Sequence, residues 1–111
     1  MKKITLMATA TAALSLSTAA FADCGEVSFS DVGWTDITAT TAATTEVLMA
    51  LGYDTDVKVL SVPVTYAAMA KGDIDIFLGN WMPTMEGDIA KYRDEGSVDT
   101  VGMNLAGAKY T

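Results

Sequence analysis

The sequence contains no histidine and only one cysteine, so it is poor in the side chains most used for acid–base and nucleophilic catalysis. It also lacks the Gly-x-Ser-x-Gly pattern of a hydrolase nucleophile. Its acidic pairs, Asp73 with Asp75 and Asp94 with Glu95, are not spaced as in a calcium-binding loop, and we interpret them as solvated charges. We therefore expect no enzymatic activity, no metal site and no cofactor.

Positive charge is scarce once the first 22 residues are set aside. Residues 23–111 hold five basic residues against fourteen acidic ones, a net charge of −9, compared with −7 for the whole chain. This balance repels nucleic acid and anionic lipid, so we expect no nucleic-acid partner. It attracts small cations, although only weakly at long range in salt.

Residues 1–22 have the composition of a secretory signal peptide. The basic start Met1-Lys2-Lys3 precedes an uncharged apolar run over residues 4–19, and Ala20-Phe21-Ala22 matches a small-x-small cleavage site. The alternative is a membrane anchor, but the run is short for a span of about 20 residues and is diluted by alanine, threonine and serine. We predict that residues 1–22 are cleaved and that the remainder is exported.

The single cysteine, Cys24, needs an explanation in an exported protein. Asp23 stands where the lipid-attachment signal requires a small residue, which argues against a lipid anchor. A disulfide partner would then come from another chain or from beyond residue 111. Because residues 105–111 contain no terminal helix or polar tail, we expect the chain to be the amino-terminal piece of a larger protein.

Alternation, glycine and proline predict alternating strands and helices after the signal peptide. Pro63 is expected in the first turn of a helix, and Gly52 and Gly72 at helix ends. This alternation predicts an α/β fold with a mainly parallel sheet and right-handed crossovers. The expected strands cover residues 26–32, 55–62, 74–78 and 98–103, and the expected helices cover residues 36–51, 63–71 and 84–93.

The first expected helix is rich in threonine, which is a poor helix former, so packing must supply part of its stability. Thr35 or Asp36 is the candidate N-cap residue. Ile37, Val47 and Leu51, together with Leu48, are the residues expected to form its buried face.

Two tryptophans follow the expected carboxyl ends of strands. Trp34 lies in Gly33-Trp34-Thr35-Asp36 after the first strand, and Trp81 lies in Gly79-Asn80-Trp81-Met82-Pro83 after the third. Ligands of open α/β sheets bind outside the carboxyl ends of strands, where the strand order reverses. If the order begins 2-1-3, the first and third strands are neighbours about 4.8 Å apart. Both indoles would then face one crevice.

Two indoles and a carboxylate suit a small organic cation. A quaternary ammonium group offers no hydrogen bond from its nitrogen and is attracted to aromatic faces, with about 1–2 kcal/mol for each desolvated contact. Asp36 would contribute charge complementarity or accept a hydrogen bond from a ligand hydroxyl.

Each of these residues also has a simpler interpretation. Tryptophans in a small domain commonly serve as packing residues, and Asp36 beside Thr35 is typical of a helix cap. Tyr110, near the end of the chain, cannot be assigned a role from its neighbouring residues alone. Other aromatic residues and methionines are expected to pack in the core: Tyr53, Tyr66, Tyr92, Met69, Met82, Met85 and Met103. An exported acidic module that uses its tryptophans as protein-contact anchors is the alternative function.

Four long motifs cover almost all of the segment after the signal peptide. The motifs are Phe29-Ser30-Asp31-Val32-Gly33-Trp34-Thr35-Asp36-Ile37-Thr38-Ala39-Thr40, Val57-Lys58-Val59-Leu60-Ser61-Val62-Pro63-Val64-Thr65-Tyr66, Asp75-Ile76-Phe77-Leu78-Gly79-Asn80-Trp81-Met82-Pro83-Thr84-Met85 and Asn104-Leu105-Ala106-Gly107-Ala108-Lys109-Tyr110-Thr111. They closely resemble the choline-binding periplasmic proteins of bacterial choline ABC transporters, within the glycine betaine and choline substrate-binding family.

This resemblance implies a periplasmic-binding-protein-like (type II) fold, of which residues 23–111 are the amino-terminal part of the first domain. It implies an aromatic box for choline in which Trp34, Trp81 and Tyr110 are walls and Asp36 is the acidic contact. It also implies a periplasmic monomer that delivers its ligand to the membrane permease and ATPase subunits of an ABC transporter.

The chain also departs from the family pattern. Family members are much longer, so a second domain, a further aromatic wall and the partner of Cys24 are expected beyond Thr111. Glycine betaine or a related betaine is the alternative ligand, although its carboxylate would meet Asp36 unfavourably.

Overall fold

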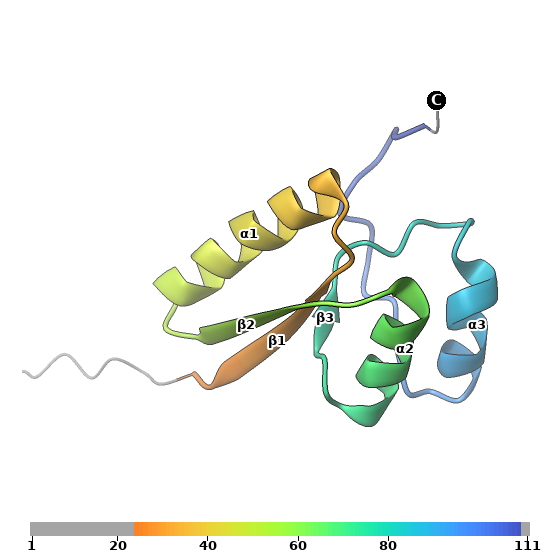
Figure 1. Ribbon diagram of the computed structural model, residues 1–111, viewed down its shortest axis with the longest axis horizontal. Helices are drawn as coiled ribbons and strands as arrows, with labels where there is room; N and C mark the ends of the chain where they lie inside the picture. Colours follow the sequence, from red (N-terminus) through yellow and green to blue (C-terminus); the bar gives the residue numbers. More distant parts are fainter. Residues whose placement is uncertain (1–23, 110–111) are drawn as a thin grey trace, which may run out of the picture.

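The computed structural model describes residues 24–109. The predicted signal peptide and Tyr110 lie outside these residues. Strands and helices alternate along the described chain, as the sequence predicts, with Pro63 in the first turn of the second helix and Gly72 at its C-cap. The elements are β1 (Glu26–Asp31), α1 (Thr35–Ala50), β2 (Asp54–Val59), α2 (Val62–Lys71), β3 (Ile76–Phe77) and α3 (Glu86–Asp94), as Figure 1 shows.

The three strands form one parallel sheet, which confirms the predicted α/β class, and their order β2-β1-β3 is the one under which the sequence analysis placed both tryptophan loops at one edge. The β1 strand pairs with β2 from Glu26↔Asp54 to Asp31↔Val59, and with β3 at Phe29↔Ile76 and Ser30↔Phe77. Because β1 is central, residues 28–31 are buried on both faces of the sheet. The carboxyl ends of β1 and β3 therefore meet at one edge.

Successive residues of β1 contact helices on opposite faces of the sheet, as alternating side chains of a strand must. The hydroxyl of Ser30 lies 2.6 Å from that of Thr65 on α2. The next residue, Asp31, accepts a hydrogen bond from Thr38 on α1. Figure 1 shows the same layering, with α1 along one side of the β1–β2 ribbon and α2 and α3 grouped beside β3.

The apolar core lies between α2, α3 and the segment that follows α3. Tyr66, Met85, Ile89 and Val98 form this core cluster, and Phe77, Trp81 and Tyr92 are among the partly buried residues packed against it. The rings of Tyr66 and Phe77 meet edge to face, with centroids 5.8 Å apart. Each large side chain buried in this way contributes about 1.5–3 kcal/mol.

The buried face of α1 differs from the predicted one. Ile37 is buried as expected, but its companions are Thr41 and Thr45, one helical turn apart, whereas Val47 and Leu51 are 60% and 64% exposed. The helix is tied at its start to β1 through Thr38, so the crossover decides which face meets the sheet. Hydrophobicity along α1 is too uniform to reveal that choice.

Several predicted element ends are also corrected. The N-cap residue of α1 is Trp34, without a side-chain cap, so Thr35 and Asp36 do not have the expected capping role. The third strand has two residues, because Asp75 uses its carboxylate rather than a backbone carbonyl to accept from the Ser28 amide. No strand forms over residues 98–103 of the described chain.

Met82 and Met103 are 42% and 81% exposed, so they are not the core residues that the sequence suggested, whereas Met85 is buried. Within residues 24–109, no helix combines the length and the apolar character needed to cross a membrane.

Candidate functional site

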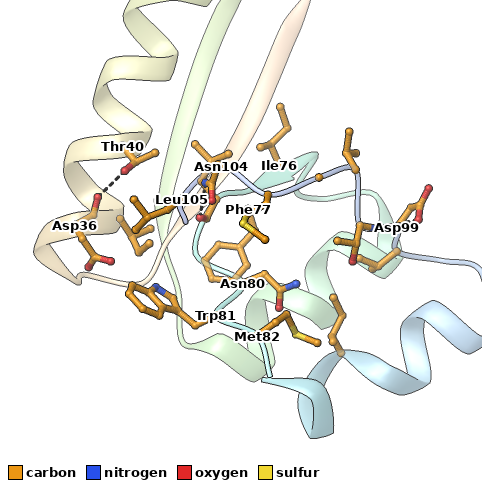
Figure 2. A pocket seen from close by; sticks show the side chains of 18 of the residues that line it. Asp36, Thr40, Ile76, Phe77, Asn80, Trp81, Met82, Asp99, Asn104 and Leu105 are labelled. Atoms are coloured by element: carbon orange, nitrogen blue, oxygen red, sulfur yellow. Dashed lines mark hydrogen bonds between the residues drawn. The ribbon is translucent and has the colours of Figure 1, made fainter. Parts of the chain in front are cut away.

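A cavity of about 850 Å³ lies at the edge where β1 and β3 end. One wall comes from the first turns of α1, with Asp36, Ile37 and Thr40. A second wall comes from β3 and the loop after it, and residues 99–108 line the remaining side (Figure 2). This is the position at which open α/β sheets bind ligands, beside the reversal of strand order at β1.

Asp36 and Trp81, which are 45 positions apart in the sequence, both line this cavity. Figure 2 shows both side chains at this pocket, Asp36 from the first turn of α1 and Trp81 from the loop after β3. The Asp36 backbone carbonyl accepts from Thr40, while its carboxylate does not cap the helix. A carboxylate and an aromatic face are therefore presented together to any ligand in the cavity.

The other two predicted site residues stand apart from this pair. Trp34 is 42% exposed and is not among the residues that line the cavity, although it lies in the same loop as Asp36. Tyr110 lies outside the described residues, directly after a segment whose residues line the cavity up to Ala108. Cys24 is exposed before β1, and its thiol lies 3.8 Å from the Leu51 carbonyl oxygen as a weak donor.

The loop that carries Trp81 is fixed by buried polar contacts. The Tyr66 hydroxyl donates to the Asn80 side-chain oxygen at 2.7 Å. The backbone amide of Trp81 lies 3.3 Å from the sulfur of Met85, whose own amide donates to the Trp81 carbonyl at 2.9 Å. Trp81 also packs against the core cluster. It is thus both a packing residue and a cavity residue, which the sequence analysis treated as alternatives.

Gly79 allows this loop to reach the first turn of α1. A Cβ atom at Gly79 would lie 2.8 Å from the Phe77 ring and 2.9 Å from Cγ1 of Ile37, closer than real Cβ contacts. A glycine is needed here for space, because its φ is not in the left-handed region. No sequence pattern beyond the glycine itself indicates this role.

The electrostatic character of the cavity is acidic. Asp36, Asp75 and Asp99 line it, and none of the described lining residues is basic. The Ser28 backbone amide and hydroxyl donate to Asp75 at 2.8 and 2.7 Å and hold the pKa of that carboxyl below its usual value. Asp75 is therefore charged at neutral pH. Sequence reasoning treated it as an ordinary solvated charge, and its pairing with Ser28 arises only from the parallel register.

Within the described part of the chain, no three acidic or cysteine side chains come together in a metal-binding arrangement. A small organic cation remains the ligand class that fits an acidic cavity with an indole in its wall.

Comparisons with known proteins agree with this geometry. Residues 25–111 match the family model described as the substrate-binding domain of an ABC-type glycine betaine transport system. An uncharacterized protein, ORF1, of Chromohalobacter salexigens is 51% identical over 94 residues, which cover 85% of this chain and 61% of that protein.

Two solved structures are 74% identical to the chain. One is an ABC-transporter choline-binding protein in complex with choline, which matches with a TM-score of 0.77 over 79% of this chain and 30% of its own length. The other is such a protein in an unliganded semi-closed conformation, with a TM-score of 0.72 over 79% of this chain and 31% of its own. The chain thus spans under a third of the length of either solved relative.

Proposed function

The chain belongs to the family of substrate-binding domains of ABC-type glycine betaine transport systems, and we propose that it is part of a protein that captures choline for uptake. The observation that carries this proposal is the acidic cavity between Asp36 and Trp81. The 74% identity to choline-binding proteins supports the same ligand. The predicted periplasmic-binding-protein-like fold is confirmed by the structural match to these proteins.

In this proposal, the cavity recognises the trimethylammonium group by charge and by aromatic contact. The Trp81 indole receives the methyl groups on its face, and each such contact contributes about 1–2 kcal/mol when water is excluded. Asp36 supplies the opposing charge. Trp34, in the same loop as Asp36, and Tyr110, just after the lining segment, are proposed as further walls of the aromatic box.

Three carboxylates in one cavity favour choline over glycine betaine. Choline carries a positive charge and a neutral hydroxyl, whereas betaine adds a carboxylate that the acidic lining would repel. Like charges 4 Å apart repel by about 1 kcal/mol even at the dielectric constant of water, and by more where water is excluded.

The proposal extends to the cellular context. Residues 1–22 would direct export and be cleaved, and residues 23–111 would form the amino-terminal part of a periplasmic binding domain. Its partners would be the permease and ATPase subunits of an ABC transporter, and it would act by binding as a monomer rather than by catalysis. A disulfide from Cys24 to a later part of such a protein remains a prediction.

The two tryptophans of the chain allow a direct test, because fluorescence reports on each separately. Trp34→Phe leaves Trp81 as the sole indole, and Trp81→Phe leaves Trp34. We expect choline to change the fluorescence of the Trp34→Phe variant in a saturable way and Asp36→Asn to weaken the response. A folded protein whose fluorescence and titration heats are insensitive to choline would contradict the proposal.

The same titration separates the ligand candidates. Tetramethylammonium should bind more weakly than choline if a hydroxyl contact contributes, and glycine betaine should bind most weakly because of the acidic lining. Sodium and lysine should have no effect. A response of Trp34 alone would place choline beside Trp34 and contradict the proposed contact with Trp81, whereas a response of neither indole would favour the alternative of a protein-contact module.

A further inference from the structure

A buried carboxylate lies directly behind the loop that carries Trp34 and Asp36. Asp31 is the last residue of β1 and is only 6% exposed. Its Oδ1 accepts from the Gly33 backbone amide at 2.8 Å, and its Oδ2 accepts from the Thr38 hydroxyl at 2.7 Å. One carboxylate therefore holds both ends of the Gly33–Thr38 segment.

This arrangement needs a reason, because burying a carboxylate costs free energy unless it is hydrogen-bonded or paired. Neither of the ion pairs found among residues 24–109 involves Asp31. Its two hydrogen-bond partners both belong to the loop and first turn that follow it. Hydrogen bonds to a charged acceptor are about twice as strong as neutral ones, so Asp31 can order this segment.

The start of α1 shows what this order achieves. The helix has no side-chain cap, although Asp36 stands in its first turn. The chain is fixed instead from β1, through the Gly33 amide and the Thr38 side chain. The Asp36 carboxylate therefore does not cap the helix and instead lines the cavity.

We propose that Asp31 is a positioning residue for the cation site, which fixes the Gly33–Thr38 segment so that Asp36 faces the ligand. This role rests on the proposed function, because it concerns the affinity of that cavity for a quaternary ammonium ion. Its structural part, the order of the loop, exists whether or not choline is the ligand.

The test removes one hydrogen bond while keeping side-chain shape. Thr38→Val deletes the donor to Asp31, and Thr38→Ser restores it. Thr44→Val is the matched control, because among residues 24–109 the Thr44 hydroxyl bonds only to the Thr40 carbonyl, within the same helix. We expect Thr38→Val to weaken choline binding about five- to tenfold, with Thr38→Ser and Thr44→Val near the original affinity.

A double-mutant cycle distinguishes positioning from general loss of stability. In an Asp36→Ala background, Thr38→Val should have little further effect on choline affinity, because the group that it positions is gone. An equal loss of affinity in both backgrounds would overturn the proposal, as would unchanged affinity in Thr38→Val.

A readout without ligand separates this proposal from the proposed function. Asp31→Ala and Thr38→Val should each increase hydrogen exchange at the Gly33 amide, and Thr44→Val should not. If the original chain does not bind choline but these exchange rates rise, the proposed function fails and the ordering role of Asp31 stands. If the Gly33 amide exchanges equally in all variants, Asp31 does not order the loop.

Discussion

The loops after β1 and β3 share the same local sequence pattern, a strand followed by glycine and tryptophan, but they are built differently. In the first loop, Gly33 has a φ of +78° and open space around its Cα. In the second, Gly79 is buried against Phe77 and Ile37. The first glycine is required for its backbone conformation, and the second is required because a side chain would not fit.

The two tryptophans also differ in their surroundings. Trp34 is 42% exposed, and the hydrogen bonds of Asp31 hold its neighbours Gly33 and Thr38. Trp81 packs against the core cluster and lines the cavity at once. The shared motif therefore predicts where each tryptophan lies relative to its strand, but not which contacts hold its loop in place. The first loop is held by hydrogen bonds to Asp31, whereas the second combines the hydrogen bond from Tyr66 with packing against the core cluster.

Substitution of Gly79 is expected to be among the most destabilising single changes. Gly79→Ala places a methyl group within 3 Å of the Phe77 ring and Ile37, so the loop or α1 must shift. Overpacking of this kind costs about 1–3 kcal/mol or more. Gly33→Ala should cost about 1 kcal/mol, because its penalty is the positive φ alone. Urea denaturation of both variants measures the difference.

Gly87→Ala provides the control for these two variants. Gly87 lies in α3 with nothing within 4 Å of its Cβ position, so alanine should raise the free energy of unfolding by about 0.5–1 kcal/mol. If Gly33→Ala proved as costly as Gly79→Ala, the contrast between the two loops would not hold.

Tryptophan truncation should give an effect of similar size at Trp81 and a smaller one at Trp34. Trp81→Ala should lower the free energy of unfolding by about 2–4 kcal/mol, because the indole packs against buried residues. Trp34→Ala should change it by less than about 1 kcal/mol, because the ring is largely exposed. Thermal unfolding of the two variants provides the comparison. Equal destabilisation by the two substitutions would show that Trp34 also supports the core.

The sequence predicted the parts of this structure that depend on local signals and on chain connectivity. Gly72 and Pro63 marked helix boundaries because their backbone preferences act within one turn. The alternation of strands and helices predicted the parallel sheet, and the 2-1-3 order brought the segments of Asp36 and Trp81 to one edge.

The remaining features depend on contacts between distant segments, which no local pattern encodes. The threonine face of α1 is buried because β1 and α1 are joined through Asp31 and Thr38, not because that face is apolar. The need for glycine at position 79 comes from the Phe77 ring and from Ile37, which lies 42 positions earlier. The cavity pairs Asp36 with Trp81 and leaves Trp34 outside its lining, a distinction that the shared motif could not make.

The Tyr66 hydroxyl is the buried anchor of the second loop and should give a smaller, pH-dependent effect. Burial, followed by the charge of Asp88, raises the pKa of Tyr66 to about 12, whereas Arg93 lowers it. Because the folded state retains this proton above the ordinary pKa of about 10, its stabilising contribution is complete below pH 10. It is lost as the pH rises from about 10 to 12.

Tyr66→Phe removes this anchor without removing the ring. The loss of the hydrogen bond to Asn80 should cost about 1–2 kcal/mol at neutral pH. Urea denaturation between pH 8 and 12 should show the original protein losing stability relative to Tyr66→Phe as the pH rises above 10. A constant difference across this range would contradict the protonated anchor.

The smallest expected effect on stability comes from a threonine of α1, the helix that follows the first loop. Thr41 is 2% exposed, and its hydroxyl has no hydrogen-bond partner within residues 24–109. Thr41→Val replaces this buried polar group by a methyl group of the same shape and should raise the free energy of unfolding by up to about 1 kcal/mol.

Thr45→Val is the matched change one turn later, on the same buried face of α1. The Thr45 hydroxyl donates to the Ala42 carbonyl at 2.9 Å. Valine at position 45 therefore removes an existing hydrogen bond, whereas valine at position 41 removes a hydroxyl that has no partner within residues 24–109. Thr45→Val should therefore be neutral or destabilising by up to about 1 kcal/mol. Opposite signs in chemical denaturation would show that polar partners, rather than apolar area alone, decide the stability of this threonine face. Equal signs would mean that α1 tolerates either side chain, and that the first loop alone sets its orientation on the sheet.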